Sequence, residues 1–280
     1  MTTAITSVQP RRPNPILQYT KKAVKRVGVV TLGVVFIPKV FLFYIICGLI
    51  DVSRNDNFNL KLLDRYFFGN GGFTWVLSPL NLFLDVLTFP YWNRGVYKKD
   101  DLPADCQAEI DRLIKTMYDR HIIEQVGQKM EGKKRGMIFF KWYGKNVDTT
   151  IEAPEFHEHY KYILTIGVSV FSSRQSTNEH FGPLRITLRV LYNLNETRSD
   201  DVYIVVGKTH HKWREEKLFI FDDTLMHQSV NQADDLRFCM FVDILRPSPI
   251  KPVLNAMVVG LRFLLASVNS IFYKKWTPIK

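Results

Sequence analysis

The sequence contains little cysteine, glycine or proline for its length of 280 residues. Its three cysteines, Cys47, Cys106 and Cys239, form no CxxC pair, and an odd number of thiols cannot all be paired. A disulfide framework and a structural zinc cluster are therefore excluded, and a reducing compartment is indicated. The 15 glycines and 13 prolines form no repeat or low-complexity tract, and 46% of the residues are hydrophobic, which excludes collagen-like and disordered chains.

Acidic residues are absent from both ends of the chain. Residues 1–26 and residues 246–280 each contain six Lys and Arg side chains and no Asp or Glu. The residues between them hold the other 26 of the 38 basic side chains and all 27 acidic ones, so the body is close to neutral. A nucleic-acid-binding face would need a basic body, so no nucleic acid partner is expected. Basic ends that adjoin apolar stretches instead favour contact with an anionic membrane surface.

Three apolar stretches accompany these basic ends. Val27–Ile50 has 24 residues and a single charge, which is long enough to cross about 30 Å of hydrocarbon. Pro38 and Lys39 lie at its middle, so the alternative to one span is a shallow hairpin of two apolar halves. Phe73–Phe89 and Val253–Tyr273 are expected either to lie in the membrane interface or to pack on the globular domain. No cleavage site follows the first stretch, so we expect a retained N-terminal apolar membrane segment rather than a signal peptide.

In the rest of the chain, the spacing of apolar residues changes from that of a helix to that of β-strands. Asp100–Glu124 carries apolar residues three and four positions apart, which predicts one amphipathic helix. From Gly136 onward, six short apolar runs without intervening helices predict a mainly β sandwich or barrel. The runs are GMIFFKWYG, YILTIGVSVFS, LRITLRVLYNL, DVYIVVG, KLFIFDD and LRFCMFVDIL. The expected divisions are a basic segment at 1–26, membrane-associated apolar segments at 27–90, a helical linker at 91–135, a β domain at 136–250 and a basic amphipathic helix at 251–280.

Two histidines and an arginine stand out within the predicted strands. His180 and His227 are 47 residues apart, on different strands or strand edges, and two imidazoles suit Fe(II), Zn(II) or Cu(II). Arg237 follows ten residues later on a strand of otherwise apolar alternation. An inward cation there would need a buried anion, and a small dicarboxylate would supply one.

The order of these residues resembles that of a known family. The run Tyr162–Pro247, which contains HKWREEKLFIFDDTLMH and FVDILRP, and the segment FFKWYG at Phe139–Gly144 resemble the aspartyl/asparaginyl β-hydroxylases. These are Fe(II)- and 2-oxoglutarate-dependent oxygenases, and the bacterial lipid A acyl-chain hydroxylases and their ornithine-lipid relatives are the members that the chain resembles most. The resemblance implies a double-stranded β-helix, or jelly roll, over 136–250 with flanking helices.

The resemblance also implies a role for five residues. His180 and His227 match the two iron-binding histidines, and Arg237 matches the arginine that pairs with the distal carboxylate of 2-oxoglutarate. Arg189 matches a second co-substrate arginine, and Ser169 stands where some members place a serine near that carboxylate. We therefore expect a dioxygenase with Fe(II) as cofactor and with 2-oxoglutarate and O2 as co-substrates.

Two positions depart from the family pattern. Gly182 stands where an HxD motif would place the carboxylate of the facial triad, and in this it resembles the peptidyl branch of the family, which uses water as the third ligand. Leu191 replaces a further histidine at the co-substrate and cannot donate a hydrogen bond. Glu179 and Asp222 are the nearby acids that could assist the metal ligands from outside.

The combination of basic ends, apolar stretches and this resemblance leads to a functional hypothesis. We expect hydroxylation of the acyl chain of a membrane lipid, either lipid A-like or an ornithine lipid, by an enzyme on the inner, cytoplasmic membrane. Fe(II) and 2-oxoglutarate are cytosolic supplies, so the catalytic domain should lie on the cytosolic side. The alternatives are a peptidyl Asp/Asn β-hydroxylase, favoured by Gly182, and a non-catalytic membrane-bound jelly roll that binds a ligand.

Overall fold

The computed structural model describes residues 15–69, 74–91, 94–130, 133–272 and 277–278. The chain divides into two compact units, residues 1–46 and residues 47–280. Much of the basic segment predicted at 1–26 lies outside the described residues, as do Lys274, Lys275 and Lys280 at the other end.

Two helices occupy the apolar stretch Val27–Ile50. Helix α1 (Pro15–Phe36) ends and helix α2 (Pro38–Val52) begins on either side of Ile37. Proline favours the first turn of a helix and cannot donate a backbone hydrogen bond in its interior, so Pro38 divides the stretch. In the part of the chain that the structure describes, no helix has both the length and the apolar character needed to cross a membrane. The predicted N-terminal membrane segment is therefore not present as one spanning helix.

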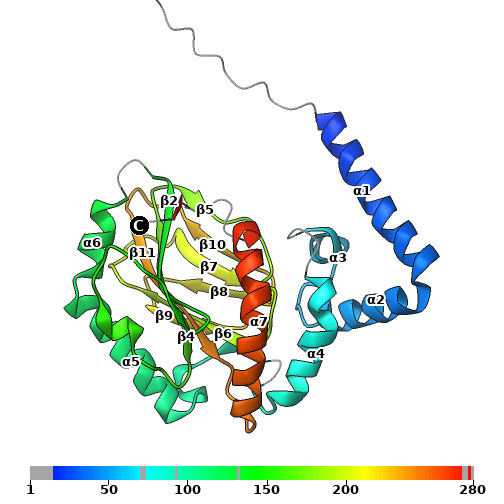
Figure 1. Cartoon of the computed structure of the whole chain (residues 1–280). Coiled ribbons are helices and arrows are strands. Elements are labelled where there is room, and N and C mark those ends of the chain that lie inside the picture. The colour runs from blue at the N-terminus through cyan, green and yellow to red at the C-terminus, as the bar shows by residue number, and fades with distance from the viewer. Residues whose placement is uncertain (1–14, 70–73, 92–93, 131–132, 273–276, 279–280) are drawn as a thin grey trace, which may run out of the picture. The chain divides into compact units, whose positions relative to one another are not determined.

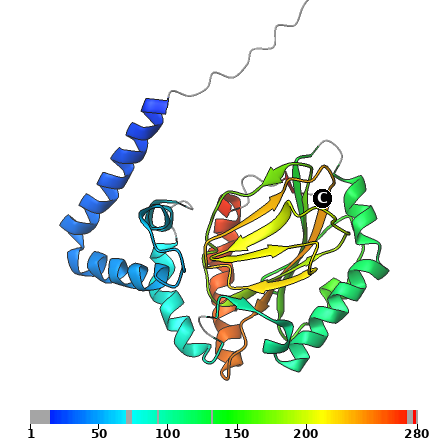
Figure 2. The ribbon, with the colours of Figure 1, turned by 180° about the vertical axis from the view of Figure 1, so that it is seen from behind.

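The second unit is built around two antiparallel sheets (Figures 1 and 2). The larger sheet has the strand order β1-β9-β6-β11-β4-β2-β12 with β3 beside β2, and the smaller has the order β5-β10-β7-β8. β12 pairs with β2 in parallel, whereas the other pairings are antiparallel. The strands are β1 (Val96–Tyr97), β2 (Arg135–Trp142), β3 (Lys145–Asn146), β4 (Ile163–Phe171), β5 (Gln175–Ser176), β6 (Thr187–Asn193), β7 (Val202–Val206), β8 (Thr209–Lys212), β9 (Leu218–Phe221), β10 (His227–Asn231), β11 (Arg237–Leu245) and β12 (Thr277–Pro278). The expected mainly β fold with antiparallel sheets and flanking helices is confirmed.

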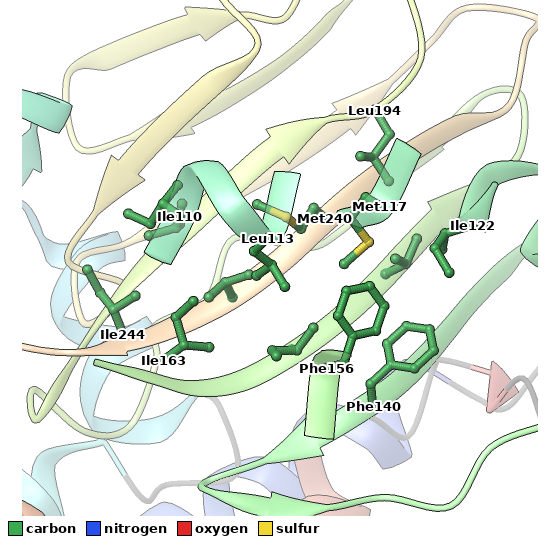
Figure 3. Packing of buried hydrophobic residues seen from close by; sticks show 14 of the residues in the cluster. Ile110, Leu113, Met117, Ile122, Phe140, Phe156, Ile163, Leu194, Met240 and Ile244 are labelled. Carbon is green, nitrogen blue, oxygen red and sulfur yellow. The ribbon is translucent and has the colours of Figure 1, made fainter. Parts of the chain in front are cut away.

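Helices α5 (Ala104–Asp119) and α6 (Ile122–Gln128) cover the outer face of the larger sheet (Figure 3). Ile110, Leu113 and Met117 of α5 pack with strand residues such as Phe140 in one buried cluster. The prediction of a single helix over Asp100–Glu124 is wrong in its extent. His121 has a left-handed backbone with a φ of 50°, which ends α5 and starts α6 in a new direction.

Strand β11 is buried on both faces, which explains its nearly continuous apolar sequence. Met240 and Val242 point to the cluster under α5 and α6, whereas Cys239 and Phe241 point to a second cluster between the two sheets. Since successive side chains alternate across a strand, Arg237 shares the inner face with Cys239 and Phe241. The space between the sheets is therefore lined by apolar side chains with a few charged ones.

Three further helices belong to this unit: α3 (Leu60–Phe68), α4 (Ser78–Leu87) and α7 (Lys251–Phe272). α4 and α7 lie side by side in both views (Figures 1 and 2) and pack through Leu84, Leu254 and Val258. The same cluster contains Tyr143 and Leu184, which also line the pocket described below.

A cluster of charged side chains within unit 47–280 connects the end of α2, α4 and the turn after β9. Its members, three aspartates and three arginines that together are neutral, are Asp51, Arg54, Asp85, Arg185, Asp222 and Arg246. Arg185 is fully buried and pairs with both Asp51 and Asp85. Burial raises the pKa of Asp51 to about 6 and that of Asp85 to about 6, with Arg54 acting in the opposite direction. Each buried charge has an opposite partner, as the cost of removing ions from water requires.

Candidate active site

One pocket between the two sheets collects all five residues that the resemblance singled out. Ser169 lies on β4, Arg189 on β6, His227 on β10 and Arg237 on β11, and His180 lies in the segment after β5. All of them line the same pocket. Five side chains from separate parts of the chain thus meet in one pocket.

The two histidines are held side by side by the backbone. His180 and His227 form an isolated antiparallel bridge in which each amide donates to the other's carbonyl, with N···O distances of 3.0 and 2.9 Å. Their ring centroids are 4.1 Å apart. This bridge places two imidazoles at the same point of the pocket wall.

The hydrogen bonds of the imidazole rings select one tautomer. Nδ1 of His180 is 2.8 Å from the carbonyl of Asn178, and Nδ1 of His227 is 2.9 Å from that of Leu225. A carbonyl only accepts, so each Nδ1 carries the proton and each Nε2 keeps its lone pair. Burial lowers the pKa of His180 and lowers that of His227 well below its usual value, which keeps both rings neutral. Two neutral imidazoles with available Nε2 atoms fit a divalent metal ion.

Gly182 is explained by the aspartate that faces it. A β-carbon added at Gly182 would overlap the carboxyl group of Asp223, and the Gly182 amide donates to the Asp223 carbonyl at 2.6 Å. The Asp223 carboxylate therefore fills the space that a side chain at 182 would need. Burial raises the pKa of Asp223 to about 7, and Oδ1 of its carboxyl group accepts no hydrogen bond from the described residues. No three His, Cys, Asp or Glu side chains of the described ranges are arranged to hold a metal ion together.

Asp223 was not among the acids predicted to assist the metal ligands, and the two acids that were predicted, Asp222 and Glu179, pair with arginine and lysine side chains elsewhere. Asp222 pairs with Arg54 and Arg246 outside the pocket, at 2.7 and 2.8 Å. Glu179 pairs with basic side chains of α3. Asp223 lies in the turn that follows β9, which ends at Phe221, so the alternation of strand residues gave no signal for it.

Arg237 is a buried cation without an acidic partner among the described side chains. It is 3% exposed, and its guanidinium lies 4.7 Å from the ring centroid of Phe171 and 5.1 Å from that of Trp213. Nε and Nη1 have no hydrogen-bond partner in the described part of the chain. Burial lowers the pKa of Arg237. Cation–π contacts offset only part of the cost of desolvating a guanidinium, so this position calls for an anion.

Arg189, in contrast, already has two carboxylate partners. Its Nε donates to Asp243 at 2.6 Å and its Nη2 donates to Asp223 at 2.9 Å. The guanidinium also lies 3.9 Å from the ring centroid of Phe241. Arg189 therefore holds Asp223 in place, whatever further contact it makes with a ligand.

The rest of the pocket wall is mainly apolar. Ser169 donates a long hydrogen bond of 3.4 Å to the Cys239 carbonyl, and Leu191 adds an apolar surface near it. Aromatic and aliphatic residues supply most of the other contacts, among them Met137, Trp142, Phe181, Leu184 and Ile204. A wall of this kind excludes water and accepts a hydrocarbon group.

The fold and the pocket together define a protein of two β-sheets with a pocket between them that contains two neutral imidazoles and a buried guanidinium. The family model described as aspartyl/asparaginyl beta-hydroxylase matches residues 105–247, which is half of the chain. The chain belongs to this family, as its sequence resemblance indicated. It is accordingly an enzyme of the oxygenase class, and the alternative of a non-catalytic binding module is set aside.

Comparison with individual proteins gives weaker relationships. An ornithine lipid ester-linked acyl 2-hydroxylase from Rhizobium tropici is 26% identical over 172 residues, which cover 58% of this chain and 60% of the relative. A cupin 2 conserved barrel domain protein from Salinispora arenicola is 14% identical, covering 40% of this chain and 77% of that one, with a TM-score of 0.26. An oxidoreductase of the 2OG-Fe(II) oxygenase family from Burkholderia pseudomallei is 15% identical, covering 33% and 49%, with a TM-score of 0.25. Structural likenesses this slight carry no argument about the site.

Proposed function

We propose that this protein hydroxylates the acyl chain of a membrane lipid, lipid A-like or an ornithine lipid, with Fe(II) held by His180 and His227 and 2-oxoglutarate paired with Arg237. The observation that carries the proposal is the pairing, in one apolar pocket, of two neutral histidines with a buried arginine that has no acidic partner among the described residues. Fe(II) with 2-oxoglutarate would supply the oxidation that inserts one atom of O2 into a C–H bond, with succinate and CO2 as co-products.

The residues of the chain prepare the pocket for that chemistry. The proton on each Nδ1 directs each Nε2 toward a metal, and the guanidinium of Arg237 suits a carboxylate, which it can take in bidentate fashion. Ser169 lies on the same wall and can donate a second hydrogen bond to that carboxylate. The carboxyl group of Asp223, held by Arg189, occupies the space that Gly182 leaves, and its Oδ1 can accept a hydrogen bond from a ligand.

Support for a lipid rather than a polar substrate comes from the apolar wall and from the named activity of the Rhizobium tropici relative. The basic ends and apolar helices suit an anionic membrane surface, and the supply of Fe(II) and 2-oxoglutarate suits the cytosolic side of the cytoplasmic membrane. The second candidate is β-hydroxylation of Asp or Asn in a peptide. Gly182 favours it, because the peptidyl branch resembles this chain at that position.

Lipid mass spectrometry on a bacterial host that expresses the protein tests the proposal. We expect one added oxygen on the acyl chain of a lipid, absent for His180→Ala and for Arg237→Ala. His210→Ala and Arg198→Ala, at exposed positions outside the pocket, serve as matched controls that keep the product. If no lipid changes while the purified protein converts 2-oxoglutarate to succinate with an Asp- or Asn-containing peptide, the peptidyl reaction replaces the lipid one.

A further inference from the structure

Helix α4 has its polar and apolar faces reversed relative to a helix on a water-soluble surface. The polar side chains of the segment Ser78–Thr88 are all buried, namely Ser78, Asn81, Asp85 and Thr88. Its outward face is apolar, and Phe83 and Val86 are 53% and 74% exposed. Asp85 is the single charged residue from Trp75 to Tyr91. A surface helix in water shows the opposite pattern.

The buried polar face of α4 is accounted for by the pocket wall beneath it. Asp85 pairs with the fully buried Arg185. Asn81 accepts a hydrogen bond from the Arg185 amide at 2.9 Å and donates one to the Pro183 carbonyl at 3.3 Å. Pro183 belongs to the segment Phe181–Leu184, which lines the pocket. α4 is thus fixed directly to the outside of the pocket wall through polar contacts, and its apolar face points away from it.

The chemistry around α4 identifies what covers this face. α7 lies beside α4 and adds exposed apolar residues, with Val253 48% and Val259 53% exposed. Arg246 is buried against Asp222, and the chain after it, residues 247–280, contains five basic residues and no acidic one, of which Lys274, Lys275 and Lys280 lie outside the described residues. An apolar helix face, together with a C-terminal sequence that carries basic residues and no acidic ones, is complementary to the hydrocarbon boundary of an anionic bilayer. With 10 residues, α4 is too short to span a bilayer, so it fits the interface.

We propose that α4 is a membrane-docking helix that inserts Phe83 and Val86 into the acyl layer of an anionic membrane. Docking brings the pocket wall at Phe181–Leu184 to the membrane surface, where an acyl chain can enter without crossing water. This entry route rests on the proposed function, whereas docking itself does not. α4 belongs to the unit 47–280, so its docking is separate from any contact that the helices of residues 1–46 make.

Site-specific fluorescence on the full-length protein tests the docking. The native cysteines Cys47, Cys106 and Cys239 are buried, so a cysteine introduced at Val86→Cys or Phe83→Cys takes an environment-sensitive dye selectively. Leu236→Cys is the matched control, because Leu236 is an exposed apolar residue in the turn before β11. The probe membrane is a vesicle of phosphatidylethanolamine and phosphatidylglycerol, with and without lipids that carry a quencher on the acyl chain. Circular dichroism checks that each labelled variant is folded.

We expect dyes at 83 and 86 to shift to shorter wavelength on vesicles and to be quenched from the acyl chain, and the dye at 236 to do neither. Adding Val86→Asp to the Phe83→Cys protein should lower the quenching about tenfold, because a carboxylate enters hydrocarbon at high cost. An unchanged dye at 83 and 86 on vesicle-bound protein would overturn the proposal, and so would a shift that occurs in buffer, which would indicate a second copy on this face. Docking without any hydroxylated lipid would contradict the proposed function and leave the docking helix standing.

Discussion

Replacement of Arg237 by methionine should separate the stability of the fold from its capacity to bind 2-oxoglutarate. The guanidinium is buried with two nitrogens that have no hydrogen-bond partner among the described residues. A buried donor without a partner lowers the free energy of unfolding by about 1–3 kcal/mol, and cation–π contacts with the two aromatic rings offset about 0.5–2 kcal/mol of that loss. Methionine fills a similar volume without a charge, so Arg237→Met should raise the free energy of unfolding by about 1–2 kcal/mol in the absence of ligand.

The same substitution should abolish high-affinity binding of the dicarboxylate. A buried, hydrogen-bonded charge pair is worth about 3 kcal/mol when one partner is removed, which corresponds to about a hundredfold in Kd. Wild-type protein should therefore gain thermal stability from 2-oxoglutarate, whereas Arg237→Met should start at a higher Tm and need about a hundredfold more 2-oxoglutarate for the same gain. The expected rise in Tm of the unliganded variant is about 2–6 °C for a domain of this size.

Thermal unfolding with increasing 2-oxoglutarate, alongside calorimetric titration, measures both effects. Arg198→Met, at an exposed position, is the control and should leave Tm and Kd within error. An Arg237→Met variant that unfolds more easily than wild type and still binds 2-oxoglutarate would refute the reasoning, since Arg237 would then be a packing residue.

Three other perturbations address the neighbouring groups. His180→Ala and His227→Ala should each weaken binding of Fe(II), or of Co(II) as its spectroscopic substitute, by about a hundredfold in equilibrium dialysis, and retained binding in either variant would exclude that histidine as a ligand. Gly182→Ala should lower the free energy of unfolding in urea by about 1–3 kcal/mol through overlap with Asp223, and adding Asp223→Ala should recover part of the loss; simple additivity would contradict the contact. The folded-state pKa of Asp51, about 6, exceeds the ordinary 3.8, so its contribution favours the fold at low pH and is lost as pH rises from about 4 to 6. Asp51→Asn should reduce the slope of urea unfolding across the same pH range and leave the part that Asp85, whose pKa is also raised to about 6, contributes.

Much of the fold followed from the pattern of apolar residues. The six predicted strand runs correspond to β2, β4, β6, β7, β9 and β11, because each is buried on at least one face and carries β-branched or aromatic residues. β8 (THHK) and β10 (HQSVN) have no such signal, since their polar residues face the pocket, solvent or neighbouring loops. β8 is placed by a short hairpin with β7, whereas β10 is placed by pairing with β7 across a longer separation in the chain.

The site residues that follow one another in a characteristic order along the chain were predictable. Contacts between side chains that are distant in the sequence were not. His180, His227 and Arg237 share a pocket, as their order in the chain suggested. The overlap between Gly182 and Asp223 involves residues 41 positions apart and has no local signature. The burial of the polar residues of α4 was likewise not predictable, because the periodicity of a short apolar segment does not show which of its faces is buried.

The reciprocal backbone bridge between His180 and His227 has a consequence for the order of folding steps: strand pairing must precede the meeting of the two rings. The two residues are 47 positions apart, so neither a growing chain nor a collapsed one brings their rings together before β10 has paired with its neighbours. Long-range strand pairing is slow compared with local helix formation. In the proposed enzyme, a metal ion held by these two rings would therefore bind only after β10 has paired with its neighbours.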